Sequence, residues 1–229
     1  MFIPGDASGL FGSLSDARRS VRAYLPTLVS DALVRQLVQR ARQAPSGANL
    51  QPGNFIQVKG QARQQLSEGL IQAWQAQAQE PEDYGYFPQP MPMALRRRQV
   101  ASAQALYAAL GIAREDQPGR DQQFARNFSF FHAPVALVVT LAHDFGPGGY
   151  MDLGMALYGL MLAAQAEGLA TCAIGAMASY PNLIRRSLDL PEGTRVVCGM
   201  ALGHADPQAP VNQTRTARGP VDDYFRVIG

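Results

Sequence analysis

The sequence has few cysteines and no block of like charges. Its 229 residues include two cysteines, Cys172 and Cys198, which are too few for a disulfide framework or a cysteine metal site. We interpret both as reduced core thiols, because cysteine is among the residues most often buried. The 20 basic and 18 acidic residues give a formal net charge of only +2. Nucleic acid is therefore not expected as a partner.

Signals for membrane insertion or secretion are also missing. Residues 1–20 lack a basic head followed by an apolar run, so no secretory signal is expected. The most apolar stretch, residues 153–166, is shorter than a membrane span and contains two glycines. It is interpreted as a buried helix. We predict no membrane association and a cytoplasmic location.

Several motifs of enzyme chemistry are absent. No Gly-x-Gly-x-x-Gly follows an expected strand, and there is no phosphate-binding lysine loop, Gly-x-Ser-x-Gly turn or His-Glu-x-x-His pair. His132, His143 and His204 are too dispersed to predict a metal site. No metal site is therefore predicted, and these motifs identify no catalytic side chain. A cofactor that carries its own reactivity becomes the economical explanation.

Hydrophobic periodicity predicts helices that alternate with strands in one large domain, residues 1–229. Helices are expected at residues 10–19, 29–43, 61–79, 95–110, 151–167 and 182–188. Strands are expected at residues 55–59, 133–141, 171–177 and 195–202. Residues 81–92 are an apolar, proline-rich loop, residues 113–123 a charged connection and residues 146–149 a turn. This order predicts an α/β or α+β sandwich around a central sheet.

Two short stretches stand out as candidate ligand contacts. Residues 18–22 read Arg-Arg-Ser-Val-Arg, and guanidinium groups present planar donor pairs to phosphate oxygens. Residues 44–52 form a loop of small and hydrogen-bonding residues that a flat ring could approach. The alternatives are solvated arginines at a helix end and a loop that only joins a helix to a strand. The residues alone leave these alternatives open; our hypothesis is that both stretches hold one anionic, flat cofactor.

Together these residues resemble the FMN-dependent nitroreductase family. The resemblance rests on RRSVRAY at 18–24, APSGANLQP at 44–52, FHAPV at 131–135, Asp152 in the apolar helix, GLATC at 168–172 and TARGPVD at 216–222. The motifs follow in order and cover essentially the whole chain. Within the family, residues 84–98 and CGMALG at 198–203 are most similar to the nitrobenzoate-reductase-like branch.

The resemblance implies an α+β fold, a three-layer α/β/α sandwich with a central, mostly antiparallel sheet. It also implies an intertwined homodimer with two FMN sites at the subunit interface, and a helical and loop excursion over residues 80–130 that covers the active site. The small residues of 153–166 would suit the dimer seam or an interior contact equally well.

The resemblance further implies which residues hold the flavin. Arg18, Arg19, Ser20 and Arg22 would bind the phosphate and nearby oxygens, with Thr216 and Arg218 closing that site. Pro45, Ser46, Gly47 and Asn49 of the second subunit would pack on the flavin, and Gln51 of the same loop is counted with them. The backbone of Ile174, Gly175 and Ala176 would lie beside the reactive nitrogen. Several relatives have an acidic side chain where Gly175 falls, so only main-chain contact is expected there.

The implied function is transfer of a hydride from NADH or NADPH through FMN to a nitroaromatic such as a nitrobenzoate, by a ping-pong reaction at one shared site. Tyr84, Tyr86 and Phe87 would stack on the aromatic substrate, unless they form a satellite hydrophobic cluster. Arg97, between Arg96 and Arg98, would meet a carboxylate, unless this basic helix face is only solvated. Alternatives are an enone, quinone or flavin reductase, an oxidase, or a non-catalytic FMN-binding dimeric protein.

Overall fold

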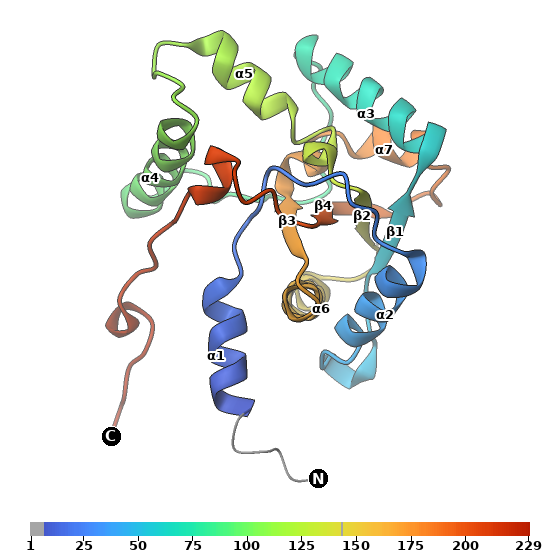
Figure 1. The fold of residues 1–229 in the computed structure, drawn as a ribbon. Helices are drawn as coiled ribbons and strands as arrows, with labels where there is room; N and C mark the ends of the chain where they lie inside the picture. Colours follow the sequence, from blue (N-terminus) through green and yellow to red (C-terminus); the bar gives the residue numbers. More distant parts are fainter. Residues whose placement is uncertain (1–6, 143) are drawn as a thin grey trace.

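The fold is built on a four-stranded sheet. The computed structural model describes residues 7–142 and 144–229, so the expectations for residues 1–6 and for His143 lie outside the described residues. Strands β1 (Asn54–Val58), β2 (Val135–Leu141), β3 (Ala170–Ile174) and β4 (Arg195–Gly203) are ordered β1-β2-β4-β3. Every neighbouring pair is antiparallel (Figure 1). All seven residues of β2 are buried, as expected for an apolar central strand.

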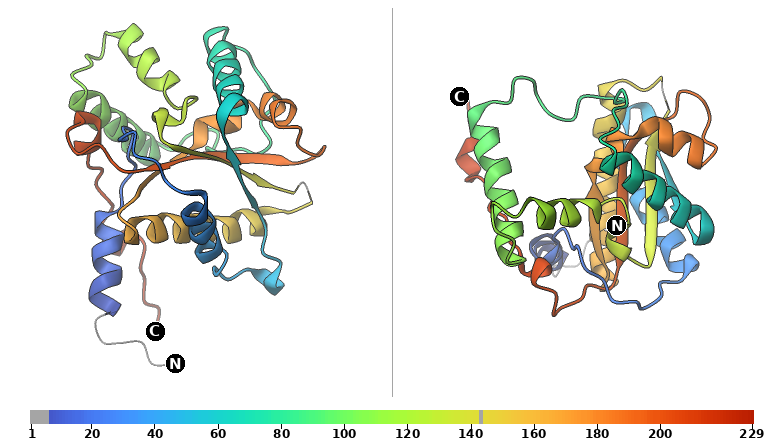
Figure 2. Two further views of the ribbon diagram at one scale, coloured as in Figure 1. Left: turned by 45° about the vertical axis from the view of Figure 1, so that its right-hand side comes forward. Right: turned by 90° about the horizontal axis from the view of Figure 1, so that it is seen from above.

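Helices cover both faces of the sheet. They are α1 (Ala7–Ala17), α2 (Asp31–Ala41), α3 (Gly60–Gln75), α4 (Met93–Ala109), α5 (Gln117–Ala125), α6 (Pro147–Ala166) and α7 (Pro181–Ser187). One core cluster joins the sheet to α3 and α7, and a second joins it to α2 and α6. The left view of Figure 2 shows these layers on opposite sides of the sheet. The predicted α+β, three-layer α/β/α architecture is therefore confirmed.

Three secondary-structure predictions from the sequence are wrong. The expected charged connection at 113–123 contains α5, which Asp116 caps by accepting a hydrogen bond of 2.9 Å from the N–H of Gly119. Residues 147–149, expected as a turn, form the start of α6, with Pro147 in its first turn. The third expected strand ends early, at Ile174, and residues 175–179 form a 3-10 turn.

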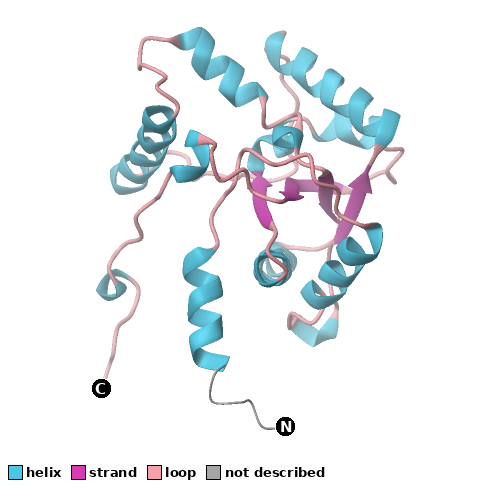
Figure 3. Cartoon of the chain, viewed as in Figure 1, coloured by secondary structure: helices cyan, strands magenta, loops and turns pink. Residues whose placement is uncertain are grey.

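The segments outside the sandwich are α1, α4 and the C-terminal residues. None of the residues of α4 is buried. The chain after Gln213 runs alongside α4 and then away from the sheet (Figures 1 and 3). No helix in the described part of the chain is long and apolar enough to cross a membrane.

Candidate functional site

A cavity of about 780 Å³ lies between the end of α1, one face of α4 and the C-terminal residues. We call it the arginine pocket. Its charged and hydroxyl-bearing lining consists of Ser15, Asp16, Arg18, Arg19, Ser20, Arg22, Ser102, Tyr158, Thr214, Arg215, Thr216 and Arg218. All six residues predicted to surround a phosphate line this one cavity: Arg18, Arg19, Ser20, Arg22, Thr216 and Arg218.

Two chain segments converge on the arginine pocket. The N-terminal arm, residues 18–25, runs along the free edge of β3, where the N–H of Val21 donates a hydrogen bond of 3.0 Å to the carbonyl of Thr171. The C-terminal arm, residues 205–218, begins two residues after β4 ends. The two arms are joined by the bridge between Tyr24 and Ala205. The basic side chains are therefore fixed by an extended backbone and not by a helix.

The pocket carries unbalanced positive charge. Asp16 is the only acidic residue in its lining, against five arginines. Burial, and then the charge of Arg215, lower the pKa of Arg19 below its ordinary value. Within the described residues, the buried Nε of Arg18 and Oγ1 of Thr214 have no hydrogen-bond partner. Orphaned donors among crowded guanidiniums fit a phosphate group, which supplies both negative charge and acceptors.

Helix α4 faces the pocket with only part of its surface. Gln99, Ser102, Ala103 and Leu106 line the cavity, and this spacing describes one helix face. Arg97 lies on the opposite face of α4, exposed. Within one chain, Arg97 therefore does not line the arginine pocket.

Arg98, the next residue, is engaged by the C-terminal residues. Its guanidinium donates a hydrogen bond of 2.8 Å to the hydroxyl of Tyr224 and lies 3.6 Å from the carboxylate of Asp223. This contact fastens α4 to the end of the chain.

The loop of residues 45–51 does not reach the arginine pocket of its own chain. Its short 3-10 turn, Gly47–Asn49, is held to α6 by Asp152, and the hydroxyl of Ser46 accepts a hydrogen bond of 2.9 Å from the N–H of Gln51. Ala48, Asn49 and Gln51 have positive φ angles. Pro45, Ser46 and Gln51 border a small hollow beside α6 instead. A site that uses both predicted stretches would thus need two chains.

The backbone at Gly175 is covered by an aromatic side chain. A Cβ atom on Gly175 would lie 3.3 Å from Cε2 of Tyr86. The ring of Tyr86 packs 4.8 Å from that of Phe87, and Phe87 lines the arginine pocket. Two of the three predicted stacking residues therefore connect the pocket to the 174–176 backbone.

Tyr84, the third predicted stacking residue, is anchored to the sheet. Its hydroxyl donates a hydrogen bond of 2.7 Å to the carbonyl of Val197. Burial, above other causes, raises the pKa of Tyr84, so the hydroxyl remains a donor. The ring packs 5.0 Å from that of Tyr150 and 6.1 Å from that of Tyr86.

Acidic residues before Tyr84 fix the base of this loop. Asp83 accepts hydrogen bonds from the N–H of Val196 at 2.7 Å and from the guanidinium of Arg185 at 2.8 Å. Glu80 accepts from the N–H of Asn182, at the start of α7, at 2.7 Å. Sequence reasoning missed these contacts, because their partners are far away along the chain.

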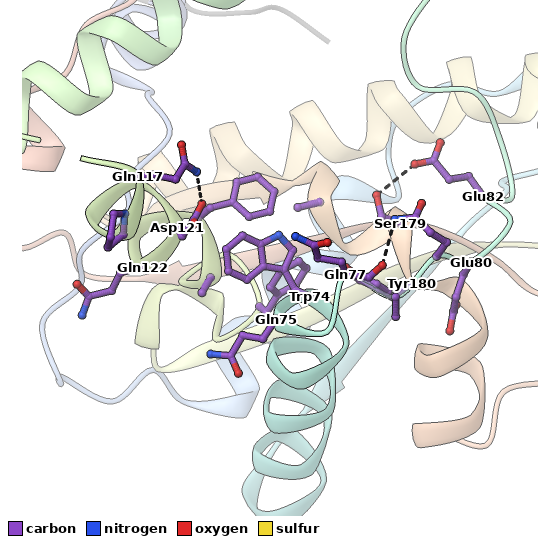
Figure 4. Close-up of a pocket in the computed structure, with 17 residues that line it drawn as sticks. Trp74, Gln75, Gln77, Glu80, Glu82, Gln117, Asp121, Gln122, Ser179 and Tyr180 are labelled. Carbon is purple, nitrogen blue, oxygen red and sulfur yellow. Dashed lines mark hydrogen bonds between the residues drawn. The ribbon is translucent and has the colours of Figure 1, made fainter. Parts of the chain in front are cut away.

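A second cavity, of about 1080 Å³, lies between the end of α3, α5 and residues 176–180 (Figure 4). Trp74 and Phe124 stack in its wall with ring centroids 5.4 Å apart. Its lining is rich in glutamine, and the charged residues that line it are Glu80, Glu82 and Asp121. Among the lining residues there is no arginine, lysine or histidine, so this cavity does not suit an anion.

Sequence reasoning also missed two residues of the arginine pocket region. Arg215 lines the pocket. The sequence TRTAR at 214–218 has a second arginine three residues before Arg218, and this spacing could have indicated it. Asn212 is buried between the two arms, and no motif indicates it. In the part of the chain that the structure describes, no group of three metal-ligating side chains occurs.

Comparison with known proteins agrees with the predicted family. The model of the nitroreductase family matches residues 16–204. The 4-nitrobenzoate reductase of Pseudomonas putida is 34% identical over 219 residues, which cover 96% of each chain.

Two solved structures are similar along nearly their whole length. The FMN and NADPH-dependent nitroreductase NfnB from Sphigopyxis sp. strain HMH is 34% identical with a TM-score of 0.90, covering 95% of this chain and 98% of that one. The FMN-dependent nitroreductase NfnB from Mycobacterium smegmatis, in complex with NADPH, is 29% identical with a TM-score of 0.91, covering 98% and 100%. The resemblance to the nitrobenzoate-reductase-like branch is confirmed, and the chain belongs to the nitroreductase family.

Proposed function

We propose that this protein is an FMN-dependent oxidoreductase that passes reducing equivalents from NADPH or NADH to nitroaromatic compounds such as nitrobenzoates. The observation that carries the proposal is the arginine pocket, with its crowded guanidiniums and orphaned donors, at the edge of the strand that leads to Gly175. The names of the similar proteins, a 4-nitrobenzoate reductase and FMN and NADPH-dependent nitroreductases, support the same chemistry.

The distance between these two features suits FMN. Ser20 pairs with Thr171, and four residues of extended chain then lead to Gly175. This corresponds to about 13 Å. A ribityl phosphate in the arginine pocket could therefore extend along β3 and bring a ring to the 174–176 backbone. Arg18, Arg19, Ser20, Arg22, Thr216 and Arg218 would hold the phosphate end.

We also propose a homodimer in which residues 45–51 of one subunit complete the site of the other. Large apolar side chains are exposed on α1, on α6 and at the C-terminal end: Leu10, Phe11, Met151, Met155, Tyr158, Val221, Tyr224, Phe225, Val227 and Ile228. Burial of such side chains is the usual driving force for association. Light scattering at micromolar concentration should give twice the chain mass, and a monomer would contradict the proposal.

FMN, when bound, supplies the hydride chemistry, and the chain supplies position and electrostatics. The arginines fix the phosphate end and thereby the orientation of the ring. Because Gly175 has no side chain, a flavin ring would meet only main-chain groups there, after displacing the ring of Tyr86 that covers them. Tyr86 and Phe87 form an apolar wall that limits access of water. Reductant and acceptor would occupy the same space in turn, which is the basis of the proposed ping-pong order.

The first experiment is a colour test followed by an acceptor screen. A yellow preparation that bleaches anaerobically with NADPH or NADH supports an enzyme, whereas a colourless protein that FMN cannot reconstitute contradicts the proposal. Nitrobenzoates, quinones, enones and free flavin should then be compared side by side. Re-oxidation fastest with nitroaromatics is expected. Faster re-oxidation by a quinone or an enone would favour the alternative reductases on the same fold.

The substrate carboxylate needs its own test. We propose that Arg97, or its neighbours Arg96 and Arg98, pairs with a benzoate carboxylate across the dimer. Arg97→Ala should then raise the KM for a nitrobenzoate and leave the KM for nitrobenzene unchanged. If none of the three alanine variants separates the two substrates, the proposed pairing is wrong.

A further inference from the structure

Asn212 is a fully enclosed polar side chain at the junction of the two arms of the arginine pocket. Only 1% of its surface is exposed, and it is one of the few buried polar residues of the described chain. It lies three residues before Arg215, in the short 3-10 turn Pro210–Gln213. A side chain this deeply buried cannot itself touch a phosphate in the cavity.

The side chain of Asn212 bonds the backbones of both arms. Its Oδ1 accepts a hydrogen bond of 2.9 Å from the N–H of Arg22, and its Nδ2 donates one of 2.8 Å to the carbonyl of Ala23. The second hydrogen of Nδ2 goes to the carbonyl of Asp206, also at 2.8 Å. The amide thus uses both of its donors and one acceptor position on main-chain groups.

The main chain of Asn212 also orients two guanidiniums. Its carbonyl accepts a hydrogen bond of 3.1 Å from Nε of Arg19 and one of 3.2 Å from Nη1 of Arg215. These two arginines come from different arms and carry like charges; burial, and then the charge of Arg215, lower the pKa of Arg19. A shared acceptor compensates part of this repulsion and fixes the direction of both side chains.

We propose that Asn212 is a positioning residue that sets the affinity of the arginine pocket for the FMN phosphate by locking the two arms together. Apart from the short 3-10 turn Pro210–Gln213, neither arm belongs to a helix or to the sheet at this point, so few other contacts define their separation. Loss of the amide would leave the arms joined mainly by the Tyr24–Ala205 bridge and its neighbouring backbone bonds. The inference rests on the proposed function, because it assumes that the pocket receives a flavin phosphate.

The experiment compares FMN with riboflavin, which has the same ring and no phosphate. In Asn212→Ala, FMN affinity is expected to fall about 10- to 100-fold, the range for a buried hydrogen-bond network left unsatisfied. Riboflavin affinity should change less than about threefold, since the ring contacts lie elsewhere. Asn212→Ser, whose hydroxyl can replace only part of the network, should give an intermediate loss and covers the case in which the alanine variant does not fold.

A matched control separates positioning from general loss of stability. Leu66→Ala removes a fully buried side chain of α3. This residue belongs to the core cluster that joins the sheet to α3 and α7, and it does not line the arginine pocket. It should destabilise the fold without changing the ratio of FMN to riboflavin affinity. Equal losses for both flavins in Asn212→Ala and Asn212→Ser, or the same change of ratio in Leu66→Ala, would overturn the inference.

Two further measurements test how Asn212 affects FMN affinity. Because Asn212 acts partly through Arg19, the double variant Arg19→Ala/Asn212→Ala should lose less FMN affinity than the product of the two single losses. Fully multiplicative losses would contradict this coupling. If the unaltered protein binds FMN no better than riboflavin, the proposed phosphate site itself fails, which is a different outcome from failure of the role of Asn212.

Discussion

The backbone N–H of Gly47 donates a hydrogen bond of 3.0 Å to Oδ2 of Asp152, which is buried in α6. This bond ties the loop of residues 45–51 to the longest helix of the chain. The loop is otherwise supported by Arg42, whose guanidinium donates to the carbonyls of Pro52 and Gly53. Its left-handed residues therefore rest on a small number of polar contacts, of which Asp152 provides the buried one.

Replacement of Asp152 should loosen this loop. In Asp152→Ala, the N–H of Gly47 loses its acceptor, and the free energy of unfolding should fall by about 1 to 3 kcal/mol. Asp152→Asn keeps an acceptor oxygen and should lose less. Urea denaturation of both variants measures the difference. Equal losses in the two variants would show that the negative charge, and not the bond to Gly47, is what stabilises the loop.

The end of the same loop makes a steric prediction. Gly53 has a φ of +91°, and a Cβ there would lie 2.5 Å from Cδ1 of Leu153. Gly60 also has a positive φ, +53°, but a Cβ there would meet nothing within 4 Å. Gly53→Ala should therefore cost about 1 to 3 kcal/mol more than Gly60→Ala, because overpacking is added to backbone strain. Thermal and urea unfolding of the pair would contradict this if the two losses were equal.

The contact between Gly175 and Tyr86 predicts an effect on substrate binding. Gly175→Ala would place a methyl group 3.3 Å from the ring of Tyr86 and displace it. The KM for a nitroaromatic should rise about tenfold, the lower end of the effect of one extra carbon in a pocket. Stability should change little, because the ring of Tyr86 is more than half exposed.

A double variant checks this interpretation. In Tyr86→Ala/Gly175→Ala the added methyl group has no ring to displace, so the second substitution should raise KM much less than it does alone. An unchanged effect in the absence of the Tyr86 ring would mean that the methyl group acts on the ligand or the backbone directly.

The ion pair between Asp83 and Arg185 anchors the loop that carries Tyr84 and Tyr86. Their side chains are 13% and 19% exposed. Asp83→Ala would leave Arg185 and the N–H of Val196 without this acceptor, at a cost of about 3 kcal/mol in unfolding free energy. It should also raise KM for the acceptor, because the loop base moves.

A solvent-exposed pair serves as the control. Lys59 bonds Asp31 at 2.7 Å with both side chains more than half exposed, so Lys59→Ala should cost much less stability and leave KM unchanged. In Asp83→Ala/Arg185→Met the buried charge is removed as well, and part of the stability should return. A loss for Asp83→Ala no larger than that for Lys59→Ala would show that the buried pair contributes no more than a surface pair.

The elements with strong apolar patterns could be predicted from the sequence, and α5 could not. Strand β2 and helix α6 are long apolar runs, so burial dictates their structure. In α5 only Gln123 is buried, and its sequence is polar. The signals for its start, Asp116 and Pro118, are local and were outweighed by the charge of the segment.

For the candidate site, the predicted residues were those with distinctive chemistry. Guanidiniums at 18, 19 and 22 indicate an anion whatever the fold, and the structure places them with Thr216 and Arg218 around one cavity. Asn212 could not be found in this way. Its partners are backbone groups as far as 190 residues away, and any residue type could provide them. Tertiary hydrogen bonds to main-chain groups leave no sequence pattern.

His132 predicts how stability depends on pH. It follows the buried Phe131 in a left-handed turn, and burial, then the charges of Arg126 and Arg63, lower its pKa below 6.5. The unfolded chain therefore binds more protons than the folded one near pH 6, so the free energy of unfolding should fall as the pH drops through this region. The full contribution is present above the unfolded pKa and is lost below it.

His132→Asn tests this contribution, since asparagine tolerates the positive φ of 57° at this position. The variant should lose less stability than the unaltered protein between about pH 8 and pH 5, where histidine titrates. Urea denaturation across this range gives the comparison directly. If the difference in unfolding free energy between the two proteins is the same at both ends of the range, folding does not shift the pKa of His132, and the prediction is wrong.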